Sequence, residues 1–252
     1  MAMALATLSV SAQGVKVGAE AGYDCVIETV KMGGYKGSGS INGFHVGPVF
    51  HFGFSENLGI KSGLLYHYAA DGVKVLGEKT STRMHTLQIP VQFAYTYNFS
   101  DNFGIYGFAG PKFDIGIALF DRTKDSDGKV YKYNDYTGKA KYDGEDVSGE
   151  DPEGAFKRFD VKFGFGVGVN FLKNFYGQFE VDFGLLNRLK KSKDKEESLK
   201  ISLDDLFDYG DYYYGDDDYD YDYDYGYGYG NAGGSDAKTH FNAIQLSLGY
   251  YF

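Results

Sequence analysis

The chain has 252 residues and a formal net charge of −10 at pH 7, and this acidic balance argues against a nucleic-acid partner. No run of about 18 apolar residues occurs, so the sequence holds no transmembrane helix, although membrane-crossing strands need only alternation. Cys25 is the only cysteine, which excludes an internal disulfide.

Residues 1–12 are interpreted as the remnant of a signal peptide. An apolar run from Met1 to Leu8 is followed by small residues around Ser11 and Ala12, where a signal peptidase would cut. The basic segment that normally precedes such a run is missing. Residues 13–252 are expected to form a single domain.

The clearest structural pattern lies between Phe159 and Phe171. Every odd position there is large and apolar, and every even position is glycine or polar. Successive side chains of a strand point to opposite faces, so this segment has one apolar face and one polar or empty face. Its length suits a membrane-crossing strand, which needs roughly 9–11 residues.

Seven further segments repeat this alternation, and the connections between them are alternately long and short. The segments are Val15–Ile27, Ile41–Phe54, Leu58–Tyr68, Met84–Phe99, Phe103–Leu119, Phe175–Leu186 and His240–Phe252. The pattern predicts an all-β fold, an eight-stranded antiparallel up-and-down transmembrane barrel with long extracellular loops and periplasmic termini. Three prolines fall inside predicted strands, so bulges or local irregularity are expected at Pro48, Pro90 and Pro111.

Alternation alone leaves the inside of the barrel undecided. A soluble lipocalin-like barrel would turn its apolar face inward. An eight-stranded lumen is only wide enough to be filled by side chains or to hold one small ligand. The bulky Phe, Tyr, Ile and Leu set therefore suits the lipid side, and the glycine-rich set, which carries opposite charges, suits the lumen.

The polar faces of the strands, which we call the polar or inward phase of the alternation, predict a lumen network of paired charges that plugs the barrel. Buried charges need partners of opposite sign. Its predicted members are Lys16, Glu20, Asp24, His45, His51, Lys61, His67, Lys112, Asp114, Asp160, Lys162, Glu180 and Asp182. The alternative for the same residues is a narrow proton or ion path, or a pH-sensitive gate that works through the histidines.

Residues 187–238 form the longest connection, an acidic Tyr/Asp/Gly-rich extracellular loop. Ten aspartates and no Lys or Arg lie between Asp204 and Asp224. This composition suits either a solvated repulsive loop or an arm that binds a surface ligand through tyrosines and carboxylates. No cofactor or metal is expected; the weak acidic candidates for a cation are Asp125, Asp127, Asp216, Asp217 and Asp218.

Three motifs carry a family resemblance. Gln88–Val91, Gly107–Pro111 and the ending Leu246–Phe252 resemble the PorT-type outer-membrane β-barrel family, whose architecture is related to OmpX and the OmpA barrel. The aromatic ending, with Tyr250 and Phe252, resembles the C-terminal signal that barrel-assembly machinery reads. The resemblance implies an accessory component of a secretion or envelope machine.

The sequence gives little support for an enzyme. His85 and His240 lie near the predicted loop end, but Ser81 and Ser235 have no nucleophile motif around them. The leading hypothesis is a non-catalytic, monomeric outer-membrane protein of a Gram-negative bacterium whose loops serve surface interaction or adhesion. The alternatives are the PorT-like accessory role and a narrow, porin-like ion or solute pore. Expected partners are outer-membrane lipid, the barrel-assembly machinery and an extracellular protein or surface ligand at the acidic loop.

Overall fold

The computed structural model describes residues 14–32, 35–75, 78–100, 102–124, 127–149, 152–190 and 237–252. Within these ranges the chain forms strands, turns and irregular segments, and all the strands pair into one sheet. No helix among the described residues is long and apolar enough to cross a membrane.

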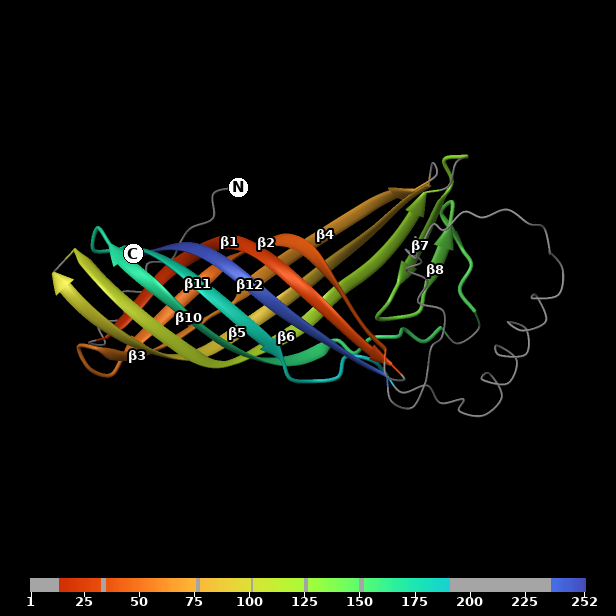
Figure 1. The fold of residues 1–252 in the computed structure, drawn as a ribbon. Coiled ribbons are helices and arrows are strands. Elements are labelled where there is room, and N and C mark those ends of the chain that lie inside the picture. Colours follow the sequence, from red (N-terminus) through yellow and green to blue (C-terminus); the bar gives the residue numbers. More distant parts are fainter. Residues whose placement is uncertain are drawn as a thin grey trace, which may run out of the picture.

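Eight antiparallel barrel strands close into a ring (Figure 1). We call each of them a stave, because one of the eight is divided into the two strands β3 and β4. In chain order they are β1 (Val15–Met32), β2 (Tyr35–Gly53), β3 (Leu58–Gly63) with β4 (Leu65–Val75), β5 (Glu78–Ser100), β6 (Phe103–Lys124), β10 (Phe159–Phe171), β11 (Phe175–Gly184) and β12 (Lys238–Tyr251). Each stave pairs with its neighbour in sequence, and β12 returns to pair with β1. The predicted eight-stranded barrel is confirmed.

β3 and β4 are one stave, interrupted at Leu64 between two prolines. Pro48 on β2 lies beside Leu64, and Pro90 on β5 lies beside the same break. Neither proline has an N–H to donate, so the ladder opens there, but the register is the same on both sides of the gap. The expected irregularity is therefore a local interruption. The register shifts of the β5–β6 pair lie elsewhere, at His85/Thr86 and Asn98/Ser100.

Six of the eight staves extend further toward the long-loop end than the alternation predicts, whereas β10 begins at the predicted residue and β11 ends two residues earlier than predicted. The connection expected between Phe120 and Arg158 is also partly strand: β6 continues to Lys124 and pairs with β7 (Val130–Asn134), followed by β8 (Ala140–Tyr142) and β9 (Glu145–Asp146). These three short strands lie beyond the end of the barrel (Figure 1). Their ten residues include three Tyr, two Lys and only two aliphatic side chains, so they lack the apolar alternation that marks the staves. We call β7–β9 the strand lobe.

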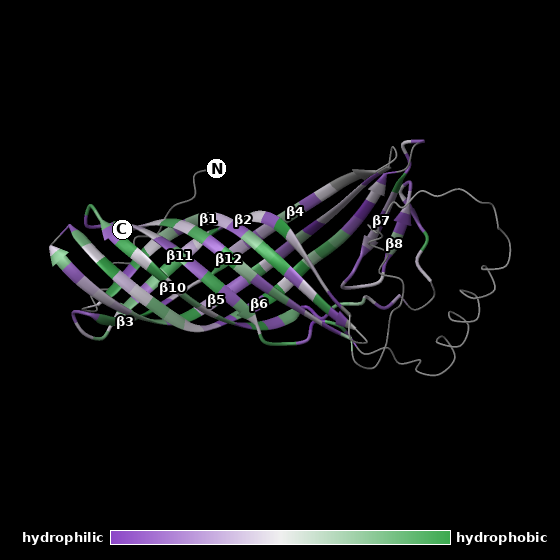
Figure 2. Cartoon of the chain, viewed as in Figure 1, coloured by the Kyte–Doolittle hydropathy of each residue, from purple (hydrophilic) through white to green (hydrophobic). Residues whose placement is uncertain are grey.

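Burial decides which face is inside. Val167 is 63% exposed and Leu248 65% exposed, whereas Asp160 and Asp182 have no exposed surface. Hydrophobic and hydrophilic residues alternate along the strands across the body of the barrel (Figure 2). The apolar face thus points outward and the charged face inward, as a lipid environment requires, and the soluble lipocalin-like alternative is wrong.

Glycines on the inward phase make room for large side chains from other staves. A Cβ at Gly249 would collide with the ring of Tyr176, and a Cβ at Gly168 would collide with Tyr106. Small residues thus stand opposite large ones, which is how a narrow barrel fills its interior. The lumen is packed with side chains.

Val167→Arg tests the inside–outside assignment. Val167 lies at the middle of β10 on the outward face, so a charge there should cost about 2–4 kcal/mol of folding free energy or block assembly. The measurement is urea unfolding in lipid vesicles, followed by heat-modifiable gel mobility.

Val147→Arg is the matched control, because Val147 is 50% exposed and lies beyond the barrel, past β9. We expect it to unfold at the wild-type urea concentration. Equal stability of both variants and wild type would contradict the assignment.

Candidate functional site

The lumen gathers most of the residues that the sequence places there. Eleven of the thirteen predicted network residues are buried. His51 is half-buried, and Lys16 is exposed at the short-turn end, where its Nζ lies 5.9 Å from the centroid of the Tyr251 ring. The inward phase of Lys16 is as predicted, but it lies at the rim, outside the buried network.

One half of the network is organised around Lys112. Its Nζ lies 2.8 Å from Asp182 Oδ2 and 3.1 Å from Glu180 Oε1, and it also donates to Gln245 Oε1 at 2.8 Å. Lys162 pairs with Asp114 at 2.8 Å. These charges are fully desolvated, so each depends on its partner.

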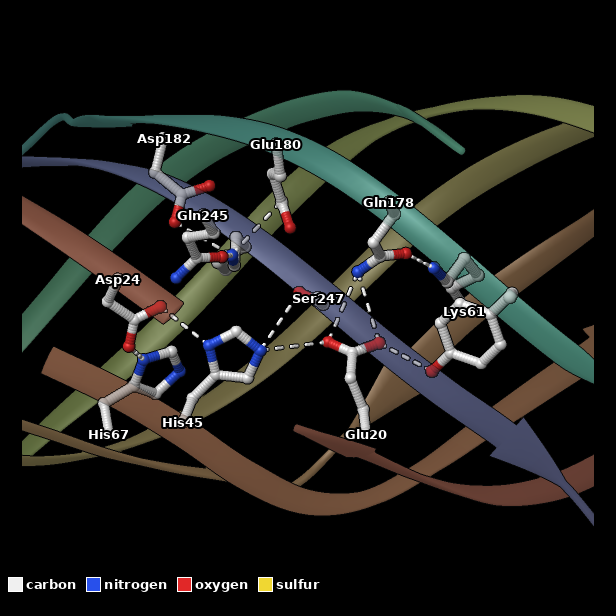
Figure 3. A network of polar contacts seen from close by, with 12 residues as sticks. Glu20, Asp24, His45, Lys61, His67, Gln178, Glu180, Asp182, Gln245 and Ser247 are labelled. Carbon is white, nitrogen blue, oxygen red and sulfur yellow. Dashed lines mark hydrogen bonds and ion pairs between the residues drawn. The ribbon is translucent and has the colours of Figure 1, made fainter. Parts of the chain in front are cut away.

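The other half is organised around Asp24 and Glu20 (Figure 3). Asp24 Oδ1 lies 2.6 Å from His45 Nδ1, and Asp24 Oδ2 lies 2.8 Å from His67 Nδ1. Glu20 accepts a hydrogen bond of 2.6 Å from the Tyr176 hydroxyl and lies 3.4 Å from His45 Nε2. The two halves together bridge the lumen from wall to wall.

Uncharged and aromatic lumen residues were missing from the predicted network. They are Thr86, Gln88, Gln92, Tyr106, Phe108, Tyr176, Gln178, Gln245 and Ser247. All lie on the inward phase, so the alternation could have found them. Tyr106 and Phe108 also share the polar face by alternation, but a network predicted from charges alone does not include aromatic side chains. The Lys61 ammonium lies 4.9 Å from the Tyr106 ring and 4.5 Å from the Phe108 ring.

A cap closes the long-loop end of the barrel. Tyr136 and Phe156, from the connection between β6 and β10, are buried against inward residues of the staves such as Met84 and Phe241. Arg188, just after β11, donates to the Tyr136 hydroxyl at 3.1 Å and lies 3.5 Å from Asp160 Oδ2. Nothing in the local sequence marks these residues as buried.

Asp135 lies within the cap, on the connection between β7 and β8, and only 2% of it is exposed. Burial, reinforced by the negative charges of Asp121 and Glu28, raises the pKa of its carboxyl to about 8. Its Oδ2 has no hydrogen-bond partner within the described residues. Asp135 is therefore a neutral acid at pH 7.

The remaining predicted site residues are scattered. Asp127 is exposed at the turn before β7. Asp125, the aspartates Asp216, Asp217 and Asp218, and the acidic tract 204–224 lie outside the described residues. His85 lies on the outer wall, 2.6 Å from the Tyr66 hydroxyl, so it contributes nothing to the lumen. Tyr250 packs edge-on against Phe175, with ring centroids 4.8 Å apart, and Phe252 is 71% exposed.

The closed ring, the apolar outer face and the charged interior define an outer-membrane β-barrel. The chain belongs to the outer membrane protein beta-barrel domain family, whose model matches residues 7–190. It is a transmembrane protein of the Gram-negative outer membrane. No curated protein matches the sequence.

Several solved structures resemble the fold weakly. Ail, the attachment invasion locus protein of Yersinia pestis, is 11% identical, with 96% of this chain and 100% of that chain covered at a TM-score of 0.43. Neisserial surface protein A is 8% identical, with 93% and 97% covered and a TM-score of 0.38. The outer membrane protease OmpT of Escherichia coli is 10% identical, with 98% and 99% covered and a TM-score of 0.34.

Lys112→Met tests whether the network holds the lumen together. Removing the ammonium leaves Glu180 and Asp182 buried without their main partner, which should cost about 3–5 kcal/mol of folding free energy. Urea unfolding in detergent micelles measures the loss. Lys16→Met, at the exposed rim, is the matched control and should lie within about 0.5 kcal/mol of wild type. Equal effects of the two substitutions would mean that the Lys112 contacts do not stabilise the barrel.

Asp135→Asn tests the cap. Because the folded-state pKa of Asp135 is raised to about 8, its contribution to stability is fully present below the unfolded value of 3.8 and is lost as pH rises through about 8. The Asn variant cannot ionise, so its protection of cap amides from hydrogen exchange should exceed that of wild type at pH 9. The difference between the two proteins should shrink toward pH 5. A difference that does not change with pH would contradict a neutral Asp135.

Proposed function

We propose that this protein is a non-catalytic membrane anchor whose strand lobe binds an anionic ligand at the cell surface. The observation that carries the proposal is a row of three exposed cations, Arg122, Lys132 and Lys141, directly opposite one another on β6, β7 and β8. We call these three residues the basic row.

The basic row sets like charges directly opposite one another, and two contacts offset part of their repulsion: Asp146 on β9 is opposite Lys141, and Lys132 Nζ lies 4.1 Å from the centroid of the Phe120 ring. Like charges directly opposite one another across a sheet repel. Lysines do protect exposed sheet edges from aggregation, but Lys132 lies on β7, which is paired on both sides. Edge protection therefore does not account for it. A bound sulfate or phosphate group would remove the repulsion and add charge-assisted hydrogen bonds.

A second set of cations supports the orientation of the barrel. Seven exposed cations lie at the long-loop end on the same outward face as the apolar band. One is Arg122 of the basic row, and we call the other six the basic collar: Lys31, Lys36, Lys79, Arg83, Lys124 and Lys238. Among the described stave residues no Asp or Glu shares this phase there. Cations next to an apolar band suit phosphorylated lipid headgroups. The collar favours long loops outside the cell and periplasmic termini.

The filled lumen weighs against the pore alternative. Both the charge network and the Tyr136–Phe156 cap cross the only interior space of a narrow barrel. The PorT-like accessory role is the second candidate, supported by the motifs at Gln88–Val91 and Gly107–Pro111. Either role is non-catalytic. Barrel-assembly machinery would recognise Tyr250 and Phe252 in both.

The binding proposal predicts that replacing Arg122, Lys132 and Lys141 together by Gln lowers affinity for dextran sulfate at least about tenfold, since each contact to a charged group contributes on the order of 1.5–3 kcal/mol. The assay is surface plasmon resonance with the purified barrel in detergent, with uncharged dextran as the blank.

The matched control replaces Lys31, Lys36 and Lys238 by Gln. Lys31 on β1 is directly opposite both Lys36 on β2 and Lys238 on β12, and the charge change is the same. The control should lose less affinity than the basic-row variant. Equal losses in both triple variants would show unspecific attraction and contradict a ligand site on the lobe.

The filled lumen predicts no single-channel current for wild-type protein in planar bilayers. Removing the cap side chains through Tyr136→Ala and Phe156→Ala should still give no current, because the network around Lys112 and Asp24 remains. Steady channels in wild-type protein would revive the narrow-pore alternative.

A further inference from the structure

Three buried side chains from neighbouring staves converge inside the barrel: Asp24 on β1, His45 on β2 and His67 on β4. The two histidines are directly opposite each other, and their ring centroids are 5.0 Å apart. One potential ligand atom from each of the three residues lies within 4.8 Å of the others. Both imidazole Nδ1 atoms face the same carboxylate (Figure 3).

The donor set is that of a transition-metal site. Two imidazole nitrogens and one carboxylate oxygen are ligands that Zn²⁺ and its first-row neighbours accept, and three protein ligands leave room for a fourth. A metal ion would take the place of the protons now shared between Asp24 and the two Nδ1 atoms.

The surroundings of His45 fit a metal ligand. Its other nitrogen, Nε2, lies 3.0 Å from Ser247 Oγ and 3.4 Å from Glu20 Oε1. A ligating histidine usually donates its second N–H to a carboxylate, which fixes the tautomer and the ring. Glu20 is itself held by Tyr176, and Gly22 leaves the space that the His45 ring occupies.

The charge balance of the lumen points the same way. Six buried carboxylates of the barrel strands (Glu20, Asp24, Asp114, Asp160, Glu180 and Asp182) share the interior with Lys61, Lys112, Lys162 and the cap residue Arg188, while the buried cap residue Asp135 has its pKa raised to about 8 and is counted as neutral. With neutral histidines the lumen carries a formal charge of −2, which one divalent cation would cancel.

We propose that Asp24, His45 and His67 bind one divalent transition-metal ion of the Zn²⁺ class inside the barrel. The proposal is independent of ligand binding by the strand lobe. The ion would cross-link three adjacent staves and neutralise the acidic side of the lumen.

The experiment uses full-length barrel without a histidine tag, folded in detergent and treated with EDTA. Titration with Co²⁺ should give the visible absorption of a protein-bound ion, saturating at one equivalent, and Zn²⁺ should displace it. His67→Gln and Asp24→Asn should each weaken Zn²⁺ binding at least about tenfold, because even outer-shell changes cost metal sites 10–100-fold.

His51→Gln is the matched control. His51 lies on the same strand as His45 and also faces inward. It is outside the cluster, and its ring packs edge-on against the Tyr251 ring, with centroids 6.3 Å apart. This variant should bind Zn²⁺ as wild type does. The 204–224 acidic tract is present in every variant, so any cation it holds is common to all. Heat-modifiable mobility verifies that each variant is folded.

Two results would overturn the proposal. One is wild-type protein that takes up no Co²⁺ or Zn²⁺ at one equivalent. The other is folded His67→Gln and Asp24→Asn protein that binds Zn²⁺ as tightly as wild type, which would place the ion elsewhere. Loss of binding in these two variants with retention in His51→Gln would establish the cluster as the site.

Discussion

The pairing of β12 with β1 is the contact on which the rest of the structure depends. It runs from Gly18 opposite Tyr251 to Lys31 opposite Lys238 and turns a sheet into a ring. In lipid, an open edge would leave a column of backbone N–H and C=O groups without water or partners. Closure satisfies those groups, and it also fixes an interior too narrow for anything but side chains.

The narrow interior explains the composition of the inward phase. A lumen lined only by large residues would not close, and one lined only by glycine would be hollow, so glycines such as Gly249 and Gly168 stand against Tyr176 and Tyr106. Charges in that space lose their hydration and must form ion pairs, as Lys112 does with Asp182. The polar network is thus a consequence of closure, whatever else the lumen does.

Alternation allowed the eight staves and their faces to be read from the sequence. Val167 and Asp182 lie where a period of two places them, because one face meets lipid and the other the packed lumen. The alternation predicts which face of the strand a side chain lies on, but not how far along the barrel it lies. It therefore could not show that Lys16 lies at the exposed rim. It also could not find Tyr136 and Phe156, whose burial comes from distant contacts with Met84 and Phe241.

The strand lobe could not be predicted from the alternation for a related reason. A stave needs an apolar face because lipid covers it. β7 and β8 lie beyond the barrel with several exposed side chains and need only a partner strand, which β6 supplies by continuing to Lys124. Such strands are free to carry charge on their exposed positions. In a protein with a net charge of −10, Arg122, Lys132 and Lys141 lie side by side, with Asp146 opposite Lys141 at the end of the row. Part of the repulsion within the row is offset by Asp146, which is opposite Lys141, and by the Phe120 ring beneath the Lys132 ammonium.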